Sequence, residues 1–297
     1  MFLYNCFMTK DPYSAVWVSH TSINDFLQCS RAYYLKHVYR DPKTGHKIKI
    51  MSAPLALGQA VHEVIESLSV LPVEQRFSTL LMDRFEDAWK NVSGKRGGFF
   101  SADTEDTYKR KGREMIARVT KNPGPIARKA VKIKEDLPHY WLSEEDNIIL
   151  CGKIDWLEYL PETDSVHIID FKTSKYDEDG DSLQLPIYYL LVTNTQKRTV
   201  AKASYWYLER NDDLTEKQLP DEKASFDRVI DVARQIKATR QLNVYTCKEG
   251  QCKYCAPYED VISGKGEFIF VDSYNTDVYV LPPKKIGDQS EDDSVIL

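Results

Sequence analysis

Length, composition and charge place the chain among ordinary globular proteins. It has 297 residues, of which 42% are hydrophobic and 29% charged, with a formal net charge of −5. This composition excludes a collagenous or low-complexity chain, and no apolar run approaches the roughly 20 residues that a membrane-spanning helix needs. Because the first residues, MFLYNCFMTK, also lack a basic segment followed by an apolar stretch, we expect an intracellular, cytoplasmic protein with no membrane partner.

The first 130 residues are predicted to be mainly helical. From Ser19 to Arg40, apolar residues recur at helical spacing after a start rich in Ser and Thr, which predicts a helix that carries Cys29. A second helix is expected over residues 56–70, where apolar residues form a stripe on one face. Two or three more helices are expected over residues 73–128.

A basic segment lies within this helical region. From Lys90 to Lys134 there are eight Lys and five Arg against four acidic residues, a local balance of +9 that leaves −14 for the rest of the chain. Such a segment is a candidate phosphate-contacting surface, because Lys and Arg supply most of the sequence-independent affinity for nucleic acid. A solvated helix face whose cations pair with nearby carboxylates is an equally good interpretation.

The pattern changes from helical to extended near Val131. Three segments rich in Ile, Val, Trp and Tyr, at about 131–142, 147–160 and 165–173, are separated by polar turns and predict an antiparallel meander. Next come, in order, a helix at 181–194, a strand at 201–210, a long helix at 222–240, a short strand near 268–273 and a loose tail at 284–297. We expect residues 1–130, 131–245 and 246–297 to be successive parts of one continuous domain.

Two aspartates and a lysine on the predicted strands form a candidate active site. If the last two strands of the meander close through a turn centred between residues 162 and 163, Asp155 and Asp170 face each other. Their carboxylates then repel unless a cation lies between them, and oxygen ligands at that distance suit Mg²⁺ or Mn²⁺. Alternation along the strand puts Lys172 on the face of Asp170.

The alternative for these residues is a buried salt bridge between Lys172 and the two aspartates, and for D-x-K alone it is the better interpretation. Both faces of the two strands are apolar, however, so the hairpin is expected to be central and covered. Charged groups are costly in such a place, and three together are more often functional than structural.

The cysteines are unevenly distributed. Half of the six lie within nine residues near the C-terminus, and the full set is Cys6, Cys29, Cys151, Cys247, Cys252 and Cys255. In an intracellular chain such a cluster indicates a metal or iron–sulfur site rather than disulfides. Outside the cluster, Cys151 is interpreted as a buried strand residue and Cys6 as a mobile terminal thiol.

Several motifs in a single order resemble those of the PD-(D/E)XK nuclease superfamily, in the RecB-like branch that includes exonuclease V-type and CRISPR-associated exonucleases. The motifs are Cys29 in a first helix, LGQAVHEVIE with His62, GKID with Asp155, IIDFKT with Asp170 and Lys172, QLPIY with Gln184 and Tyr188, and the C-terminal cysteines. The resemblance covers most of the chain. It implies an α/β (α+β) fold with a restriction-endonuclease-like core, in which helices flank a mixed central sheet between an N-terminal helical region and a C-terminal cysteine cluster.

The resemblance also implies a function. The expected activity is Mg²⁺- or Mn²⁺-dependent hydrolysis of DNA phosphodiesters by an exonuclease that prefers single strands, in recombination, repair or phage- or CRISPR-related processing. The expected partners are DNA, single-stranded or with a free end, and recombination or repair proteins, with nucleoid association in a prokaryote. A non-catalytic DNA-binding assembly subunit that keeps the fold is the alternative, and an RNA substrate stays open.

The resemblance gives individual residues their roles. His62 would join Asp155 and Asp170 as a ligand of the catalytic metal, although an isolated His on an amphipathic helix is more often a core or capping residue. Glu66, one turn further on, would orient His62 or a metal-bound water. Lys172 would hold or deprotonate the attacking water, or stabilise charge on the phosphorus.

Two further pairs of residues are expected to act on DNA. Gln184 and Tyr188 match a Q-x-x-x-Y motif that in the family lies beside the active site and is associated with DNA handling. Tyr33 and Tyr34 are candidate stacking platforms for an unpaired strand.

The C-terminal cysteines depart from the family pattern. RecB-like nucleases with a 4Fe–4S cluster take one Cys from the N-terminal helix and usually three as C-x2-C-x5-C, but here Cys247 precedes the Cys252 and Cys255 pair and Val261 occupies the last position. With Cys29, four thiolates are still present, enough for a cluster or a structural Zn²⁺. The resemblance favours 4Fe–4S, and the altered spacing leaves Zn²⁺ or an incomplete site open.

Overall fold

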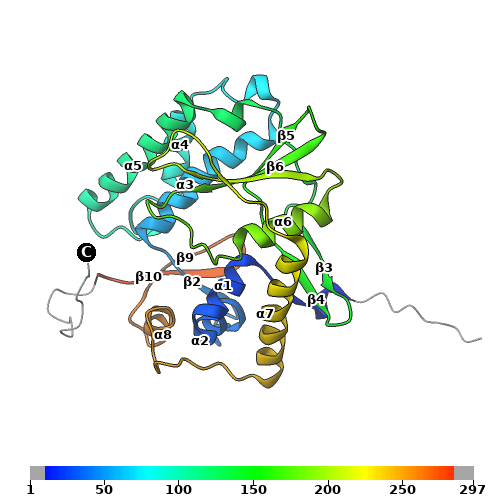
Figure 1. The fold of residues 1–297 in the computed structure, drawn as a ribbon. Helices are drawn as coiled ribbons and strands as arrows, with labels where there is room; N and C mark the ends of the chain where they lie inside the picture. The colour runs from blue at the N-terminus through cyan, green and yellow to red at the C-terminus, as the bar shows by residue number, and fades with distance from the viewer. Residues whose placement is uncertain (1–10, 284–297) are drawn as a thin grey trace, which may run out of the picture.

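The computed structural model describes residues 11–283, so the predictions for Cys6 and for the tail lie outside the described residues. Figure 1 shows helices packed around strands that come from distant parts of the chain. The helices are α1 His20–Gln28, α2 Ser30–Tyr33, α3 Ala53–Ser67, α4 Leu81–Lys90, α5 Ala102–Lys121, α6 Gln184–Thr195, α7 Glu222–Leu242 and α8 Ala256–Ile262. The strands are β1 Val16–Val18, β2 Lys47–Ile50, β3 His139–Ser143, β4 Ile148–Cys151, β5 Trp156–Leu160, β6 Ser165–Lys172, β7 Val200–Tyr207, β8 Thr215–Lys217, β9 Glu267–Val271 and β10 Thr276–Val280.

The strands of the described residues form three sheets. The largest has the order β5-β6-β7-β8 and is mixed, because β6 and β7 run parallel while the outer pairs run antiparallel. Helix α6 makes the crossover that a parallel pair requires. The smaller sheets have the orders β1-β4-β3 and β2-β10-β9. The predicted mixed α/β class with a helix-flanked mixed sheet is therefore confirmed.

The predicted three-stranded meander is wrong. The segment 147–160 contains two strands, β4 and β5, which belong to different sheets, and only the last four residues of the segment 131–142 belong to a strand, β3. The break begins at Gly152, where a Cβ atom would come within 2.8 Å of Leu191 Cδ1 on α6. The chain changes sheets where α6 packs closely against it, and local hydrophobicity does not encode such a contact.

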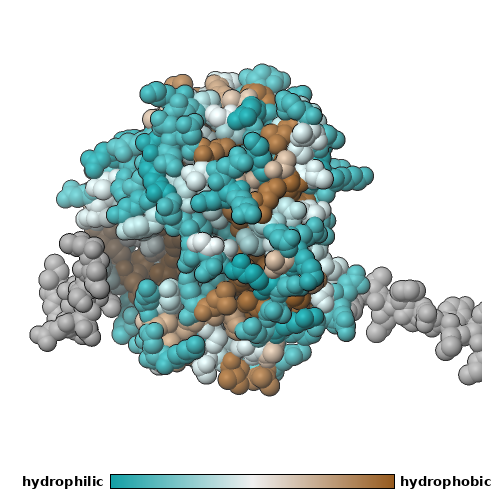
Figure 2. All heavy atoms as spheres, viewed as in Figure 1, coloured by the Kyte–Doolittle hydropathy of each residue, from teal (hydrophilic) through white to brown (hydrophobic). Residues whose placement is uncertain are grey.

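Helices cover both faces of the central sheet. On one face Trp156, Phe171 and Trp206 belong to a cluster with apolar residues of α3, α4 and α5, and on the other Ile168 and Tyr205 pack with residues of α6 and α7. Strand β6 is buried along its whole length except at its last residue. Figure 2 shows a face on which hydrophilic residues predominate. The central position predicted for this hairpin is confirmed, and a charge on β6 lies in an apolar environment.

The predicted helix over residues 19–40 is interrupted at Cys29. Helix α1 ends at Gln28, and Cys29 is extended (φ −167°, ψ 116°) before α2 begins. The backbone N–H of Ala32 donates to Cys29 Sγ at 3.4 Å, so the thiol caps the new helix. Cys29 therefore lies between two helices and not within one, which the spacing of apolar residues did not predict.

The other predicted elements are confirmed with small shifts in their ends. Helices α3, α6 and α7 match the segments 56–70, 181–194 and 222–240, α4 and α5 lie within 73–128, and β7 and β9 match the two later strands. The short elements β1, β2, β8, β10 and α8 were not predicted. None of the helices in residues 11–283 is long and apolar enough to cross a membrane.

Gly112 permits the close packing of the helices that carry and support the candidate site. A Cβ atom there would lie 2.3 Å from Phe85 Cζ on α4 and 3.2 Å from Leu57 Cδ1 on α3. We expect Gly112→Val to lower the free energy of unfolding by about 1–3 kcal/mol, because both neighbours are buried and must move. Denaturant titration followed by circular dichroism measures this.

The matched control for Gly112 is Ala117→Val, which introduces the same side chain at an exposed position of α5. Intrinsic helix propensity favours Val over Gly at 112 and disfavours Val relative to Ala at 117. If propensity rather than packing decided the outcome, Ala117→Val would be the less stable of the two variants, and that result would contradict the prediction.

Candidate active site

The register of the β5 and β6 hairpin is the one that the sequence predicts. Trp156 pairs with Ile169 and each following residue of β5 pairs in step, so Asp155, one residue before β5, stands opposite Asp170. Asp155 is therefore not within a strand, which corrects the prediction by one residue. The backbone N–H of Phe171 donates to Asp155 Oδ2 at 2.9 Å and fixes this carboxylate against β6.

Lys172 is held by three acceptors. Its Nζ lies 3.1 Å from Asp170 Oδ2 and 2.8 Å from Glu178 Oε2, and it donates to Gln184 Oε1. The amide nitrogen of Gln184 in turn donates to Asp170 Oδ1 at 2.9 Å and to Tyr188 Oη at 3.2 Å. The first turn of α6 thus links the aspartate, the lysine and the tyrosine in one hydrogen-bond network.

His62 lies beside the same pair of aspartates. Helix α3 buries its apolar face against α4 and α5, which leaves His62 and Glu66, four residues apart, on the side toward the sheet. His62 Nδ1 is 3.5 Å from Asp155 Oδ2 and 3.5 Å from Glu66 Oε1. Glu66 also pairs with Lys153, which comes just before β5 and is more than half exposed. The geometry places Glu66 where it can orient His62.

The electrostatics show that the site favours positive charge. Burial opposes the charged form of His62, but the carboxylates of Asp155 and Glu66 outweigh it and raise the pKa of His62 to about 10. Burial also opposes ionisation of Asp155, yet His62 and hydrogen bonds hold the pKa of Asp155 below its ordinary value. Burial, reinforced by repulsion from Asp155, raises the pKa of Asp170 to about 7. The proton on His62 thus supplies positive charge that the carboxylates of Asp155 and Glu66 favour.

The donor atoms fit a divalent metal ion. His62, Glu66 and Asp155 each offer one ligand atom, and these atoms lie within 4.8 Å of one another. Asp170 is outside this compact group because Gln184 donates to its Oδ1 and Lys172 forms an ion pair with its Oδ2 at 3.1 Å. An imidazole with several carboxylates suits Mg²⁺ or Mn²⁺. The structure therefore adds Glu66 to the three ligands that the sequence predicts.

Sequence reasoning missed Glu178. It follows β6 in the segment SKYDEDGDS, where one acidic residue among several gave no signal. Ser182 Oγ donates to Glu178 Oε1 at 2.7 Å, and the backbone N–H of Glu178 donates to Tyr207 Oη at 3.0 Å. These two contacts fix the carboxylate against Lys172, which only the fold brings near it.

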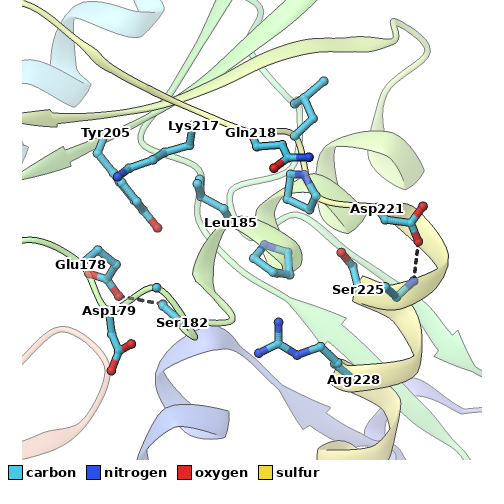
Figure 3. A pocket seen from close by; sticks show the side chains of 15 residues that line it. Glu178, Asp179, Ser182, Leu185, Tyr205, Lys217, Gln218, Asp221, Ser225 and Arg228 are labelled. Atoms are coloured by element: carbon cyan, nitrogen blue, oxygen red, sulfur yellow. Dashed lines mark hydrogen bonds between the residues drawn. The ribbon is translucent and has the colours of Figure 1, made fainter.

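A pocket of about 390 Å³ adjoins this lysine (Figure 3). Glu178 and Tyr205 lie on its wall, with Lys217 and Arg228 on elements β8 and α7. Lys172 Nζ is 5.0 Å from the centre of the Tyr205 ring. A ligand in the pocket would therefore lie next to the groups that hold Lys172.

The four predicted cluster cysteines also come together. Cys29, Cys247, Cys252 and Cys255 offer sulfur atoms within 4.8 Å of one another, and none of them forms a disulfide. Four free thiols at this distance fit a thiolate-bound metal site. Cys151 is buried in β4, as predicted, and its Sγ donates to the carbonyl of Val18.

The aromatic side chains proposed as stacking platforms are not free to stack. Tyr33 is 1% exposed and packs between Phe26, His37 and Tyr245. The prediction that Tyr33 is a stacking platform for DNA is wrong, because its ring is buried in the core. Tyr34 is partly buried, and its ring lies 4.6 Å from that of Tyr245.

The basic helix α5 uses most of its cations in ion pairs. The pairs are Lys109 with Glu86, Arg113 with Glu86, Lys111 with Glu209 and Arg118 with Asp212. The interpretation as an ion-paired helix face therefore holds for these four cations. Arg110, Lys121 and Lys129 are exposed and form no ion pair among the described residues, so contact with phosphate stays a prediction for them.

The raised pKa of Asp170 predicts that the site weakens the metal-free fold. An acid whose pKa is higher in the folded chain binds its proton more tightly there than in the unfolded chain. The proton on Asp170 therefore stabilises the fold at low pH, and this stabilisation is lost as pH rises through about 7. We expect Asp170→Asn to raise the free energy of unfolding by about 1–2 kcal/mol at pH 8 in EDTA. Denaturant titration measures this, and the difference should shrink at pH 5.

The control for Asp170 is Asp179→Asn, an exposed carboxylate that does not contact Lys172. It should leave stability unchanged at both pH values. A metal-free Asp170→Asn protein that is less stable than the wild type at pH 8 would show that the repulsion is not the dominant force.

Comparison with known proteins identifies the family. A family model described as the PD-(D/E)XK nuclease superfamily matches residues 17–260. Among solved structures, one described as "Putative exonuclease" from Eubacterium rectale is similar with 13% identity and a TM-score of 0.48, over 86% of this chain and 93% of that chain. No curated protein matches the sequence significantly. Because the family model spans most of its length, the chain belongs to the PD-(D/E)XK nuclease superfamily.

Proposed function

We propose that the protein is a divalent-metal-dependent deoxyribonuclease that removes nucleotides from DNA ends and prefers single strands. The observation that carries the proposal is the network in which Asp155, Asp170 and Lys172 meet His62 and Gln184 in a buried setting. Three ionisable groups in an apolar surrounding cost folding free energy, so they indicate a function more than a structural role. Family membership gives that function as nucleic-acid cleavage.

The metal and the lysine have separate tasks in this proposal. Mg²⁺ or Mn²⁺ held by His62, Asp155 and Asp170, with Glu66 as a further donor, would polarise the phosphoryl oxygen and stabilise the leaving 3′ oxygen. Lys172 stays charged because Asp170 and Glu178 outweigh the effect of burial and raise its pKa. A charged ammonium beside the carboxylates can orient the attacking water and stabilise the charge that develops on the phosphate.

Residues of α6 position this lysine. Gln184 accepts from Lys172 while its amide donates to Asp170, so one side chain sets the distance between the two. Tyr188 receives the second amide hydrogen of Gln184 and holds it in this orientation. We propose that the residues of the Q-x-x-x-Y motif position Lys172 in this way and also contact DNA.

The pocket beside Glu178 supports the preference for single strands. Its volume of about 390 Å³ is that of a small-ligand site and suits one unpaired nucleotide. Lys217 and Arg228 can pair with a phosphate in the pocket, whose wall also carries the carboxylates of Glu178, Asp179 and Asp221. A stacked, paired base cannot enter without being unpaired first, so a free strand is the better substrate.

The wider setting also belongs to the proposal. A DNA end-processing enzyme would act inside the cell, on the nucleoid of a prokaryote, with recombination or repair proteins or in phage- or CRISPR-related processing. At the cysteine site we propose a bound metal with a structural role: the resemblance implies a 4Fe–4S cluster, and a Zn²⁺ ion is the alternative. The rival for the whole chain is a non-catalytic assembly subunit, but such a subunit has no need for the charged network around Lys172.

Substitution of the central residues tests the activity. We expect Lys172→Ala and Asp155→Ala to lower cleavage of end-labelled single-stranded DNA with Mn²⁺ or Mg²⁺ by about 10²–10³-fold or more, because each removes a charge that the transition state needs. The wild type should be inactive in EDTA and should leave circular single strands uncut. RNA and double-stranded DNA in parallel reactions measure substrate preference.

The control for this experiment is Lys175→Ala, an exposed lysine three residues further along the chain. It should cleave at the wild-type rate. Activity that survives Lys172→Ala would refute the mechanism. A wild-type protein that binds single strands but cuts none under any metal condition would instead support the assembly subunit.

Glu178 gives a more specific test of how Lys172 is held. Glu178→Gln keeps the shape but removes one of the two carboxylates that contact Lys172, so we expect kcat to fall about tenfold with KM nearly unchanged. Steady-state cleavage of a fluorescent single strand measures both constants. Glu162→Gln, an exposed carboxylate in the turn between β5 and β6 and outside the pocket, serves as the matched control, and equal rates for the two variants would rule out a positioning role for Glu178.

A further inference from the structure

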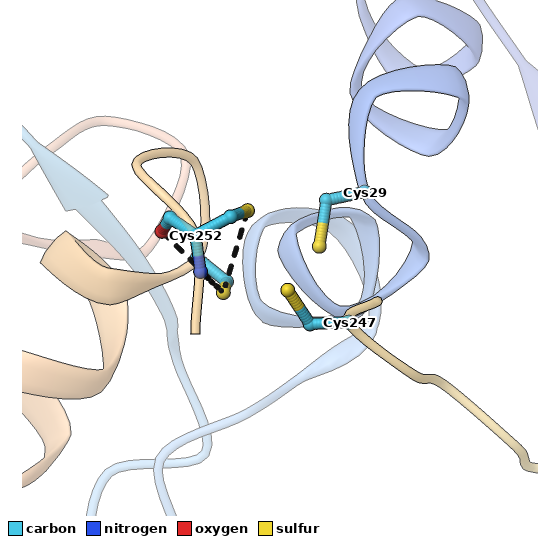
Figure 4. A group of neighbouring side chains, drawn as sticks. Cys29, Cys247 and Cys252 are labelled. Carbon is cyan, nitrogen blue, oxygen red and sulfur yellow. Dashed lines mark hydrogen bonds between the residues drawn. The ribbon is translucent and has the colours of Figure 1, made fainter. Parts of the chain in front are cut away.

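The four-cysteine site joins three separate parts of the chain (Figure 4). Cys29 lies at the interruption between α1 and α2, Cys247 in the loop after α7, and Cys252 and Cys255 just before α8. Cys29, Cys252 and Cys255 are buried, and Cys247 is partly exposed. The site has a small apolar cluster of its own, separate from the two clusters that cover the central sheet.

The separation of the sulfur atoms distinguishes the two metals that four thiolates can hold. All four lie within 4.8 Å of one another, and Cys252 Sγ is 3.7 Å from Cys255 Sγ. A single Zn²⁺ binds thiolates at about 2.3 Å, which sets their sulfurs about 3.8 Å apart at the corners of a tetrahedron. In a 4Fe–4S cluster each thiolate binds a different iron, so the cysteine sulfurs stand roughly 6 Å apart.

We propose that this site binds one tetrahedral Zn²⁺ ion through Cys29, Cys247, Cys252 and Cys255, and not the 4Fe–4S cluster that the resemblance implies. The four sulfur atoms lie closer together than a cubane requires, so a cubane would need the cysteine side chains or their segments to move apart. Their separation is close to the one that a single ion requires. Zn²⁺ undergoes no redox reaction, so its role here is structural.

The chain around the cysteines supports the smaller site. Where the family pattern has its last cysteine, this chain has Val261, which is 5% exposed in α8 and packs against Gly266. Cys247, which precedes the Cys252 and Cys255 pair in the sequence, takes the place of that cysteine as the fourth ligand. A site for a single ion therefore explains both the altered spacing of the cysteines along the chain and the short distances between their sulfur atoms.

Neighbouring contacts hold the segments at this separation. Ser30 Oγ donates to the carbonyl of Thr246 at 2.9 Å, and Arg31 pairs with Glu259 at 2.9 Å. Both contacts join α2 to the C-terminal segment on either side of the thiols. A single ion leaves both contacts in place, because the sulfur atoms are already at about the separation that it requires.

The metal content of the purified protein tests the proposal. The protein is expressed with iron–sulfur assembly proteins in iron-supplemented medium and purified without oxygen, because these conditions favour a cubane. Zinc, iron and acid-labile sulfide per chain are measured in the wild type and in Asp155→Asn, whose catalytic site lacks one ligand. We expect about one zinc, no sulfide and no colour in both proteins. Iron with sulfide, a single iron, or a metal-free chain would each overturn the proposal.

Two serine variants locate the ion. Cys247→Ser changes the partly exposed ligand and should lose most of the zinc, whereas Cys151→Ser changes a buried cysteine outside the site and should keep it. Equal zinc in both would overturn the assignment of the ligands. If Cys247→Ser does not fold, the wild-type metal content still decides between zinc and iron. The result is independent of whether the protein cleaves DNA.

Discussion

The register of the β5 and β6 hairpin is the constraint on which the proposed catalytic centre depends. Backbone pairing alone places Asp155 opposite Asp170, although their two carboxylates repel each other. A shift of β6 by one residue would turn Asp170 and Lys172 together to the other face of the sheet and separate them from Asp155. The apolar residues that β6 presents to both helical layers prevent such a shift, so the packing of the core also fixes the geometry of the site.

The charges that this register brings together are only partly compensated within the protein, because the carboxylates outnumber the cations that contact them. Lys172 compensates Asp170 and Glu178, and His62 compensates Asp155 and Glu66. Since these groups lie in an apolar surrounding, each is stable only while its partner is present. The network therefore needs α3, β6 and the first turn of α6 to be packed correctly at the same time. This explains why a single hairpin carries a site that draws on distant parts of the sequence.

The two candidate metal sites follow different physical rules. The carboxylate and imidazole donors His62, Glu66 and Asp155 are partly exposed, as suits a hard cation that must also meet a substrate. The four thiols lie within 4.8 Å of one another, and three of them are buried. As ligands of one ion, they would hold the N-terminal helices to the C-terminal segment across more than 200 residues of chain.

The sequence by itself determined the catalytic pair and much of the local structure. Period-2 alternation and a short turn are local properties, so the register of Asp155 and Asp170, the position of Lys172 and the long helices could be read from residues near one another. Ordered motifs then identified His62, Gln184 and Tyr188. Four cysteines could likewise be recognised as one site, but their spacing along the chain did not give the distances between their sulfur atoms.

Only the tertiary structure decided which segments meet. The change of sheet at Gly152 depends on α6, the role of Glu178 on the path of the chain after β6, and the burial of Tyr33 on contacts with α7 and the residues that follow it. The same holds for the ion pairs that occupy α5. These features depend on contacts between residues that are far apart in the sequence. Local propensity and periodicity describe each segment alone, so they carry no information on such contacts.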